Sequence, residues 1–229
     1  AAVSADLKGI ELINSVADKE SVIELYKQFG TSAVTAIGSL NWRTAGFVAT
    51  NNGAKLTADD SAKIARFVTL CDACSIPVVT FVDSEGFEKS SAAELAGSIR
   101  DSAKLAQAYA SATTAKIAVV TGKAYGSAYV ALASTAAGSD FTFAWEGAVI
   151  APTTPEAAVV FLNGVSEDNA KQAQEYADNE ADAFTAAANG YVDRVITAED
   201  TKSALTSAIE ATSSKRVVTP AKKHVNFVY

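Results

Sequence analysis

The sequence predicts a single α/β domain, and three observations support this prediction. Short apolar and β-branched runs of strand length recur along the 229 residues, separated by longer segments with helical spacing. Strands that alternate with helices are typical of a sheet covered by helices. Apolar residues make up 49% of the chain and charged residues 20%, which allows a sizeable core. Because no repeat or low-complexity tract divides the sequence, we expect residues 1–229 to form one domain with a short N-terminal lead-in segment and a C-terminal tail.

The first half of the chain is expected to start with the lead-in and then to alternate strands with helices. Thr57 is a good residue type for a helix N-cap, and Asp59 and Asp60 follow it in the predicted first turn. Apolar residues at helical spacing give this helix a core-facing stripe. In chain order, we expect short helical pieces over 10–30, strands over 34–40 and 45–50 joined by a hairpin-length link, a helix from Thr57 to the two cysteines, and a strand over 78–82.

The second half is expected to continue this alternation. An Ala-rich segment over 91–112 predicts one long helix that turns Leu95, Ile99, Leu105 and Tyr109 inward. The other predicted elements are a strand over 116–121, a helix over 127–135, short strands over 140–145 and 148–151, a helix from Pro155 to about Leu162, a helical segment over 166–189, an extended segment over 191–196, a last helix capped by 197–200, and a tail over 222–226.

The stretch over 116–135 is the one around which these elements are organised. Gly122 and Gly126 follow the predicted strand and allow a tight reversal into the small, apolar helix. Such a turn points the first free backbone N–H groups of the helix into the cleft above the strand ends. These groups can hold an anion or a developing oxyanion without any ionisable side chain. Packing alone also explains such glycines, and this stretch by itself leaves both interpretations open.

Charge and cysteine content exclude several functional classes. Lys and Arg number 19 against 26 for Asp and Glu, and the resulting net charge of −7 argues against a nucleic-acid partner. No apolar run approaches the ~20 residues that span a bilayer, and we expect a cytoplasmic protein. Cys71 and Cys74 form a C-x-x-C at the end of a predicted helix, where the helix dipole disfavours a thiolate. We therefore expect buried, reduced cysteines rather than a redox or zinc pair.

Few residues are suited to acid–base catalysis. The only histidine, His224, lies in the predicted tail, so no Ser–His–Asp set is expected, and neither a P-loop nor a G-x-G-x-x-G turn occurs. Asp83 and Glu85 follow a strand end and are candidates to line a cleft, although loop solvation and turn formation are the favoured explanation. Two strand-end glycine loops remain, over 83–87 and 122–128. They fit chemistry that rests on oriented backbone donors, with acid–base work left to the substrates or a cofactor.

A series of motifs along the chain lies at 57–68, 71–73, 76–83, 86–87, 123–129, 144–145, 155–156, 190–193 and 222–224. In their order and approximate spacing, these motifs resemble a known family, the carboxyltransferases of biotin-dependent acyl-CoA carboxylases and decarboxylases. The similarity runs from about Leu7 to the C-terminus and is specific to the C-terminal, biotin-side half of that subunit. It implies a crotonase-like α/β fold, the ββα superhelix.

The resemblance also implies a site and a mechanism. The backbone N–H groups of Ser127 and Ala128 would hold the ureido oxygen of biotin, with Gly126 setting the approach. Carboxybiotin would release CO₂, the biotin enolate would take the α-proton of the acyl-CoA, and the protein would stabilise the enolate oxygen. Ser127 stands where the family usually has a second glycine. The residues implied for the biotin and acyl pocket are Gly86, Phe87, Tyr125, Tyr129 and Val130, of which Val130 would face a short acyl group.

Cofactors and partners follow from the same resemblance. The cofactor would be biotin on a carrier protein, the substrate an acyl-CoA of the acetyl, propionyl or methylmalonyl type, and no metal would bind in this domain. Expected partners are the N-terminal carboxyltransferase half, the biotin carboxyl carrier protein, and biotin carboxylase or decarboxylase subunits. A homo-oligomer, trimeric or hexameric, would form through the Ala-rich helices over 91–112 and 131–136.

Two other functions stay open at this point. A stand-alone crotonase-like hydratase, isomerase or thioesterase would need a carboxylate over the oxyanion hole, and Glu85 is the loop candidate. A non-catalytic assembly domain would dock the biotin carrier without any chemistry. The sequence decides neither the acyl-CoA nor the direction of carboxyl transfer, because fold does not fix function.

Overall fold

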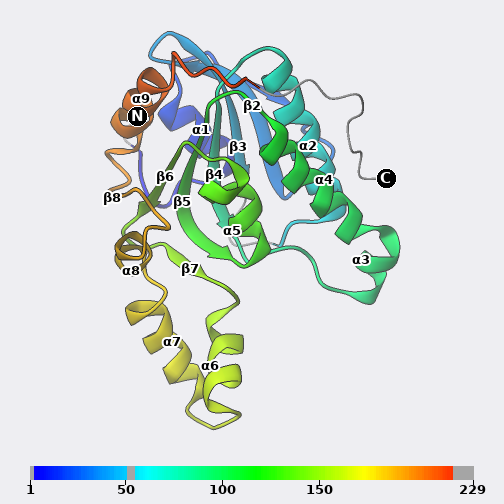
Figure 1. Ribbon diagram of the computed structural model, residues 1–229, viewed down its shortest axis with the longest axis vertical. Helices are drawn as coiled ribbons and strands as arrows, with labels where there is room; N and C mark the ends of the chain where they lie inside the picture. Colours follow the sequence, from blue (N-terminus) through cyan, green and yellow to red (C-terminus); the bar gives the residue numbers. More distant parts are fainter. Residues whose placement is uncertain (1–2, 51–54, 219–229) are drawn as a thin grey trace.

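The computed structural model describes residues 3–50 and 55–218, which form one eight-stranded sheet with helices on both faces (Figure 1). This confirms the predicted α/β class. The strands follow the order β1-β2-β3-β4-β5-β6-β8 across the sheet, and β7 pairs with β5. Their bounds are β1 Ile23–Leu25, β2 Ala33–Leu40, β3 Arg43–Thr50, β4 Val78–Ser84, β5 Lys116–Tyr125, β6 Phe141–Trp145, β7 Val149–Ala151 and β8 Arg194–Ile196.

Strand direction divides the sheet into two parts. β1, β2 and β3 pair antiparallel, whereas β3, β4, β5, β6 and β8 are parallel neighbours. The long strand β5 pairs with β6 along its first half and with β7 along its second half, also in parallel. The carboxyl ends of β3, β4, β5 and β7 therefore meet at one edge of the sheet, where α/β proteins commonly place their sites.

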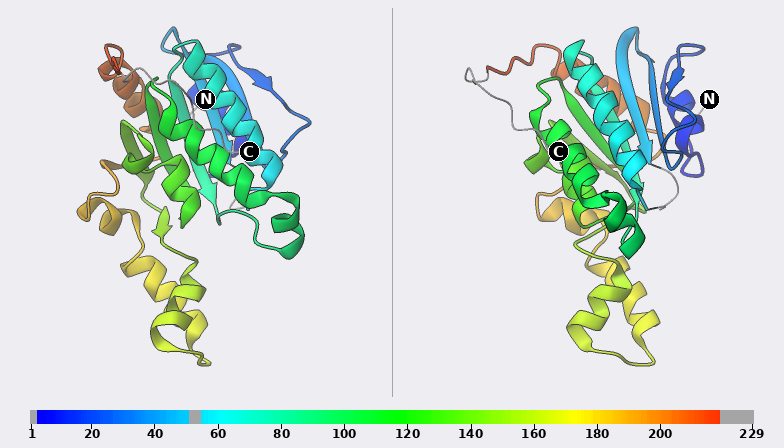
Figure 2. Two further views of the ribbon diagram at one scale, coloured as in Figure 1. Left: turned by 45° about the vertical axis from the view of Figure 1, so that its right-hand side comes forward. Right: turned by 90° about the vertical axis from the view of Figure 1, so that its right-hand side faces the viewer.

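Alternation along the strands fills a core on each face of the sheet. Phe47 and Phe81 point to the face covered by α1 and α9, and their neighbours Val48 and Val82 point to the opposite face. Figure 2 shows α2 and α4 side by side across that opposite face. The helices are α1 Gly9–Val16, α2 Ala58–Ala73, α3 Ser91–Ala96, α4 Ser98–Ser111, α5 Ser127–Leu132, α6 Pro155–Asn163, α7 Asn169–Asn179, α8 Ala183–Ala188 and α9 Thr201–Ala211.

The predicted hairpin between β2 and β3 is confirmed, and one carboxylate supports its turn. Asn41 and Trp42 connect the strands with φ values of 49° and 64°, the left-handed region that a two-residue hairpin requires. The Asp18 carboxylate accepts hydrogen bonds from the N–H groups of Asn41, at 3.2 Å, and Trp42, at 2.9 Å. It also accepts one from the Ser39 hydroxyl at 2.8 Å. This local strain is thus offset by hydrogen bonds to a charged acceptor.

We expect the contribution of Asp18 to stability to disappear in acid. The Trp42 N–H, followed by Ser39 and Asn41, holds the pKa of Asp18 below its usual value of 3.8. Because the ionised form is preferred in the folded state, Asp18 stabilises the fold above about pH 4 and loses this effect as the pH falls through its lowered pKa. Carboxyl NMR titration should give an Asp18 pKa below 3.8, with the Trp42 amide shift following the same curve. A titration at or above 3.8 would contradict the role of this carboxylate.

The long helix predicted over 91–112 is wrong, because the segment contains two helices. Gly97 has a φ of 97° and separates α3 from α4. The break changes which side chains face the core: Leu95 and Ile99 are 90% and 67% exposed, whereas Leu105 and Tyr109 are buried as predicted.

Other predictions needed smaller corrections. The lead-in contains the strand β1 besides the helix α1, and the segment over 166–189 divides into α7 and α8. Cys71 is buried but Cys74 is exposed, so the expectation of two buried cysteines holds only for the first. The predicted tail over 222–226, with His224, lies outside the described residues. None of the helices that the structure describes has the length and apolar character needed to cross a bilayer.

Candidate functional site

The two glycine loops singled out from the sequence lie next to each other at the carboxyl edge of the sheet. β4 and β5 run in parallel up to the pair formed by Ser84 and Ala124. Just beyond it, Gly86 adopts a φ of 108° and lies where a β-carbon would be 3.7 Å from the Tyr125 carbonyl oxygen. Residues 83–87 and 122–128, far apart in the chain, therefore border the same space.

Gly122 does not form the predicted reversal, since β5 continues through it to Tyr125. The space that a β-carbon would fill at Gly122 is occupied by the Asp83 carboxylate, only 2.6 Å away. The same carboxylate accepts a hydrogen bond from the Lys123 N–H at 3.0 Å, and the Asp83 N–H donates to the Thr50 hydroxyl at 2.7 Å. Gly122 thus permits a close approach that ties the ends of β3, β4 and β5 together.

The reversal takes place at Gly126 alone. This residue has φ 56° and ψ −131°, a backbone conformation that residues other than glycine rarely adopt. Its N–H donates to the Ala151 carbonyl oxygen at 2.9 Å, and a β-carbon there would be 3.0 Å from the Pro152 carbonyl oxygen. The end of β7 therefore fixes the turn from which α5 begins. The sequence analysis did not identify Ala151 and Pro152, because they act through backbone atoms that no local pattern marks.

The turn leaves backbone donors free at the start of α5. The N–H groups of Ser127 and Ala128 have no acceptor within the helix, as at any helix start, and neither reaches another acceptor in the described part of the chain. Ser127 is exposed, whereas Ala128 is fully buried beneath it. The helix is shorter than predicted and ends at Leu132, before a 3₁₀ turn over Thr135–Ala137.

Two tyrosines flank the turn as neutral hydrogen-bonding groups. Tyr125 is buried against Ala151 and Ala181, and burial raises the pKa of its phenol. The Tyr129 hydroxyl donates to the Tyr191 carbonyl oxygen at 2.6 Å, and burial raises its pKa to about 12. Both phenols therefore stay protonated at neutral pH and are unsuited to act as bases.

The remaining predicted pocket residues differ in exposure. Phe87 is half-buried against the core beneath α2 and α4, whereas Val130 is 52% exposed on α5. Glu85 forms an ion pair of 2.7 Å with Lys123, and this hydrogen bond raises the pKa of Lys123. The edge thus offers backbone donors, apolar surface and one ion pair. Among residues 3–50 and 55–218, no three His, Cys, Asp or Glu side chains gather closely enough to hold a metal ion.

Comparison with known proteins assigns the chain to a family. A family model described as "Carboxyl transferase domain" matches residues 7–227, nearly the whole chain. The chain belongs to this family. The match confirms the resemblance inferred from the ordered motifs.

Relatives of this carboxyl transferase domain act on acyl-CoA, according to their names. The propionyl-CoA carboxylase beta chain of Cereibacter sphaeroides is 38% identical over 223 residues, covering 94% of this chain and 44% of the relative. The methylmalonyl-CoA carboxyltransferase 12S subunit of Propionibacterium freudenreichii subsp. shermanii is 36% identical over 228 residues, covering 95% of this chain and 44% of that relative. The chain therefore spans less than half the length of these relatives.

A solved structure shows the same fold. The transcarboxylase 12S structure, described as a hexamer assembly with methylmalonyl-coenzyme A and methylmalonic acid bound, matches with a TM-score of 0.91 at 35% identity. The match covers 100% of this chain and 46% of that one. A single-chain long-chain acyl-CoA carboxylase matches with a TM-score of 0.79 at 24% identity, which supports the fold alone. The crotonase-like α/β fold expected from the sequence is thereby confirmed.

Proposed function

We propose that this chain is the biotin-side half of a carboxyltransferase and moves CO₂ between biotin and a short-chain acyl-CoA. The observation that carries the proposal is the pair of free N–H groups on Ser127 and Ala128, held at the carboxyl edge by the Gly126 turn. Family membership and the acyl-CoA substrates named for the relatives support it. Acetyl-, propionyl- and methylmalonyl-CoA are the proposed substrate class.

The residues at the turn fit a planar ureido ring. Gly126 permits the turn that holds the two donors, and the positive φ of Gly86 shapes the loop beside it. Phe87, Tyr125 and Tyr129 would supply apolar and aromatic surface around the ring, and Val130 would face the acyl group. Biotin, when bound, supplies the nitrogen that carries the carboxyl group.

The protein's own contribution would be electrostatic. The N–H groups of Ser127 and Ala128 would stabilise negative charge that develops on the ureido oxygen, and they cost no reorganisation because the turn already holds them. One well-placed donor of this kind contributes about 10²–10³ in turnover. No side chain at the edge has to exchange a proton, which agrees with the two neutral tyrosines and the paired Lys123.

The chain would act together with other chains or domains. Because it spans less than half of its relatives, the acyl-CoA-binding half is the proposed first partner. A biotin carboxyl carrier protein, biotin carboxylase or decarboxylase subunits, and a trimeric or hexameric assembly are the others. The hexamer described for the transcarboxylase 12S structure supports this assembly.

No observation at the site favours the hydratase, isomerase or thioesterase alternative. That function needs a carboxylate free to exchange protons, whereas Glu85 is held in an ion pair with Lys123.

Saturation-transfer NMR with biotin methyl ester tests the proposal, since it detects the weak binding expected of half a site. Ser127→Pro removes one donor at the first helical position, where proline is well tolerated, and Ser127→Ala is the matched control that keeps it. We expect biotin methyl ester to bind the wild type and Ser127→Ala alike, and Ser127→Pro about fivefold more weakly, as for one lost hydrogen bond. A response to coenzyme A alone would overturn the assignment of this half to biotin.

A further inference from the structure

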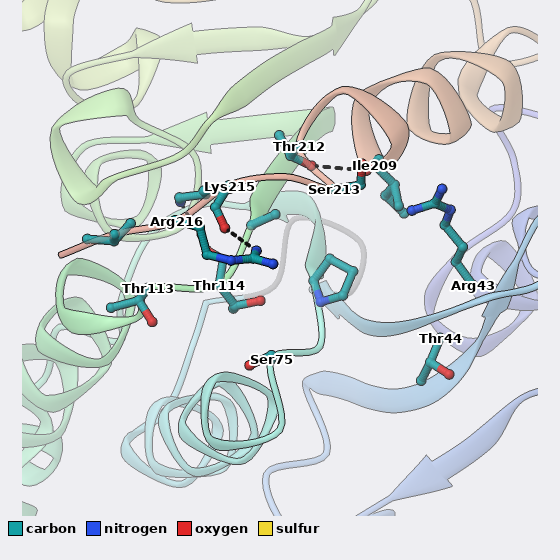
Figure 3. Close-up of a pocket in the computed structure, with 13 residues that line it drawn as sticks. Arg43, Thr44, Ser75, Thr113, Thr114, Ile209, Thr212, Ser213, Lys215 and Arg216 are labelled. Atoms are coloured by element: carbon teal, nitrogen blue, oxygen red, sulfur yellow. Dashed lines mark hydrogen bonds between the residues drawn. The ribbon is translucent and has the colours of Figure 1, made fainter.

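A cavity lies at the edge of the sheet opposite the Gly126 turn, the amino-terminal edge (Figure 3). Its volume is about 710 Å³, within the range of small-molecule sites. Arg43 at the start of β3, Pro77 before β4 and Ala115 before β5 contribute to its wall. Since β5 has ten residues and strands rise about 3.3 Å per residue, roughly 30 Å separates this cavity from the Gly126 turn. The proposed function does not use it.

The cavity is basic, although the chain carries a net charge of −7. Arg43, Lys215 and Arg216 line it, and no carboxylate does. Lys215 is neutralised by Asp140 at 2.8 Å and donates to the Thr114 carbonyl oxygen at 3.1 Å. In contrast, neither arginine has a carboxylate partner among the described residues. Two uncompensated guanidinium groups therefore face one cavity.

Hydrogen bonds to helix ends do not account for these arginines. α2, α4 and α9 all end near the cavity, and their C-terminal carbonyl groups attract cations. Lys215 donates to the Thr114 carbonyl oxygen at this edge, but the Arg216 guanidinium donates only to the carbonyl oxygen of its neighbour Lys215, at 2.8 Å. The Arg43 guanidinium donates no hydrogen bond to any part of the chain that the structure describes. Figure 3 shows their side chains approaching the cavity from opposite sides.

We propose that this cavity binds a phosphate-bearing metabolite of nucleotide size. Guanidinium groups match phosphate oxygens with two parallel hydrogen bonds, and the Ser75 and Ser213 hydroxyls on the wall can add donors. Pro77 and Ile209 provide apolar surface for a base or another flat group. The site is separate from the carboxyl edge, so its ligand is not the reacting substrate of the same chain.

Isothermal titration calorimetry with ADP tests this site, with adenosine as the probe that lacks phosphate. We expect ADP to bind and adenosine not to bind. Arg43→Met and Arg216→Met should each weaken ADP binding about tenfold, as for a lost charged hydrogen bond. Lys171→Met removes the same charge from an exposed position on α7 and should leave ADP binding unchanged.

Three outcomes would overturn the proposal: no ADP binding at millimolar concentration, equal binding of adenosine, or ADP affinity unchanged in both arginine variants. Both arginines are exposed, so their replacement should leave the fold intact, and a thermal melt checks this. The biotin methyl ester response should persist in both variants. This separates a failure here from a failure of the proposed function.

Discussion

Asp60→Ala is expected to lower the free energy of unfolding by about 3–5 kcal/mol, the range measured when one partner is removed from a buried charged network. Asp60 is fully buried at the start of α2. One carboxylate oxygen accepts from the Thr57 N–H and hydroxyl, at 2.9 and 2.6 Å. The other accepts from the Ala33 N–H at 3.0 Å. A single side chain thus caps the helix and holds the first residue of β2.

The buried side chain of Lys63 makes the loss of stability in Asp60→Ala larger. It is 2% exposed and donates to the carbonyl oxygens of Gly30, at 3.2 Å, and Ala33, at 2.7 Å. Burial lowers the pKa of Lys63, and the nearby charge of Asp60 opposes this effect. Without Asp60, less of the cost of burying the ammonium group is compensated.

Urea or thermal unfolding measures this difference, and about 3–5 kcal/mol should lower the melting temperature by about 10 °C in a chain of this size. Asp59→Ala is the matched control, because Asp59 is exposed in the same helical turn. It should change stability by less than about 0.5 kcal/mol. Asp60→Ala combined with Lys63→Met should recover part of the loss. Equal effects of the Asp59 and Asp60 replacements would refute the network.

Local chemistry made the first half of the fold predictable. The hairpin over 33–50 and the start of α2 depend on residues close in the chain, and Thr57 caps the helix as predicted. The prediction of one helix over 91–112 failed because it also relied on local spacing alone. Leu95 and Ile99 have helical spacing, but the left-handed Gly97 breaks the helix and turns both side chains outward.

The site was predictable in its residues but not in its geometry. Gly122 and Gly126 look alike in the sequence, yet the first gives room to the Asp83 carboxylate and only the second makes the turn. The difference depends on two strands that pair with β5. β4 carries Asp83 to Gly122, whereas β7 pairs with only the last part of β5, next to Gly126. The roles of Ser127 and Ala128 remain predictions.

No local sequence pattern predicted the cavity at the amino-terminal edge of the sheet, for a related reason. Its basic residues come from the start of β3 and from the segment after α9, more than a hundred residues apart. No spacing rule links Arg43 to Arg216. Only the parallel order of β3, β4 and β5, together with the packing of α9, brings these segments to one edge.

Gly126→Ala is expected to abolish biotin binding at the carboxyl edge and, in the assembled enzyme, to lower turnover by at least about 10², the effect of losing one oxyanion donor. An L-residue at φ 56° and ψ −131° costs about 1–3 kcal/mol in backbone strain. Its β-carbon would also meet the Pro152 carbonyl oxygen at 3.0 Å, so either β7 or the turn has to move. Any such movement redirects the N–H groups of Ser127 and Ala128.

Gly164→Ala separates this steric effect from backbone strain. Gly164 has a φ of 81° at the end of α6, but no atom lies within 4 Å of its missing β-carbon. Gly164→Ala should therefore lose stability through backbone strain alone, with unchanged biotin binding. The amide resonances of Ser127 and Ala128 report the difference directly, because titration with biotin methyl ester should shift them in the wild type and in Gly164→Ala only. If Gly126→Ala keeps these shifts, the turn does not position the donors, and the electrostatic role assigned to this edge is wrong.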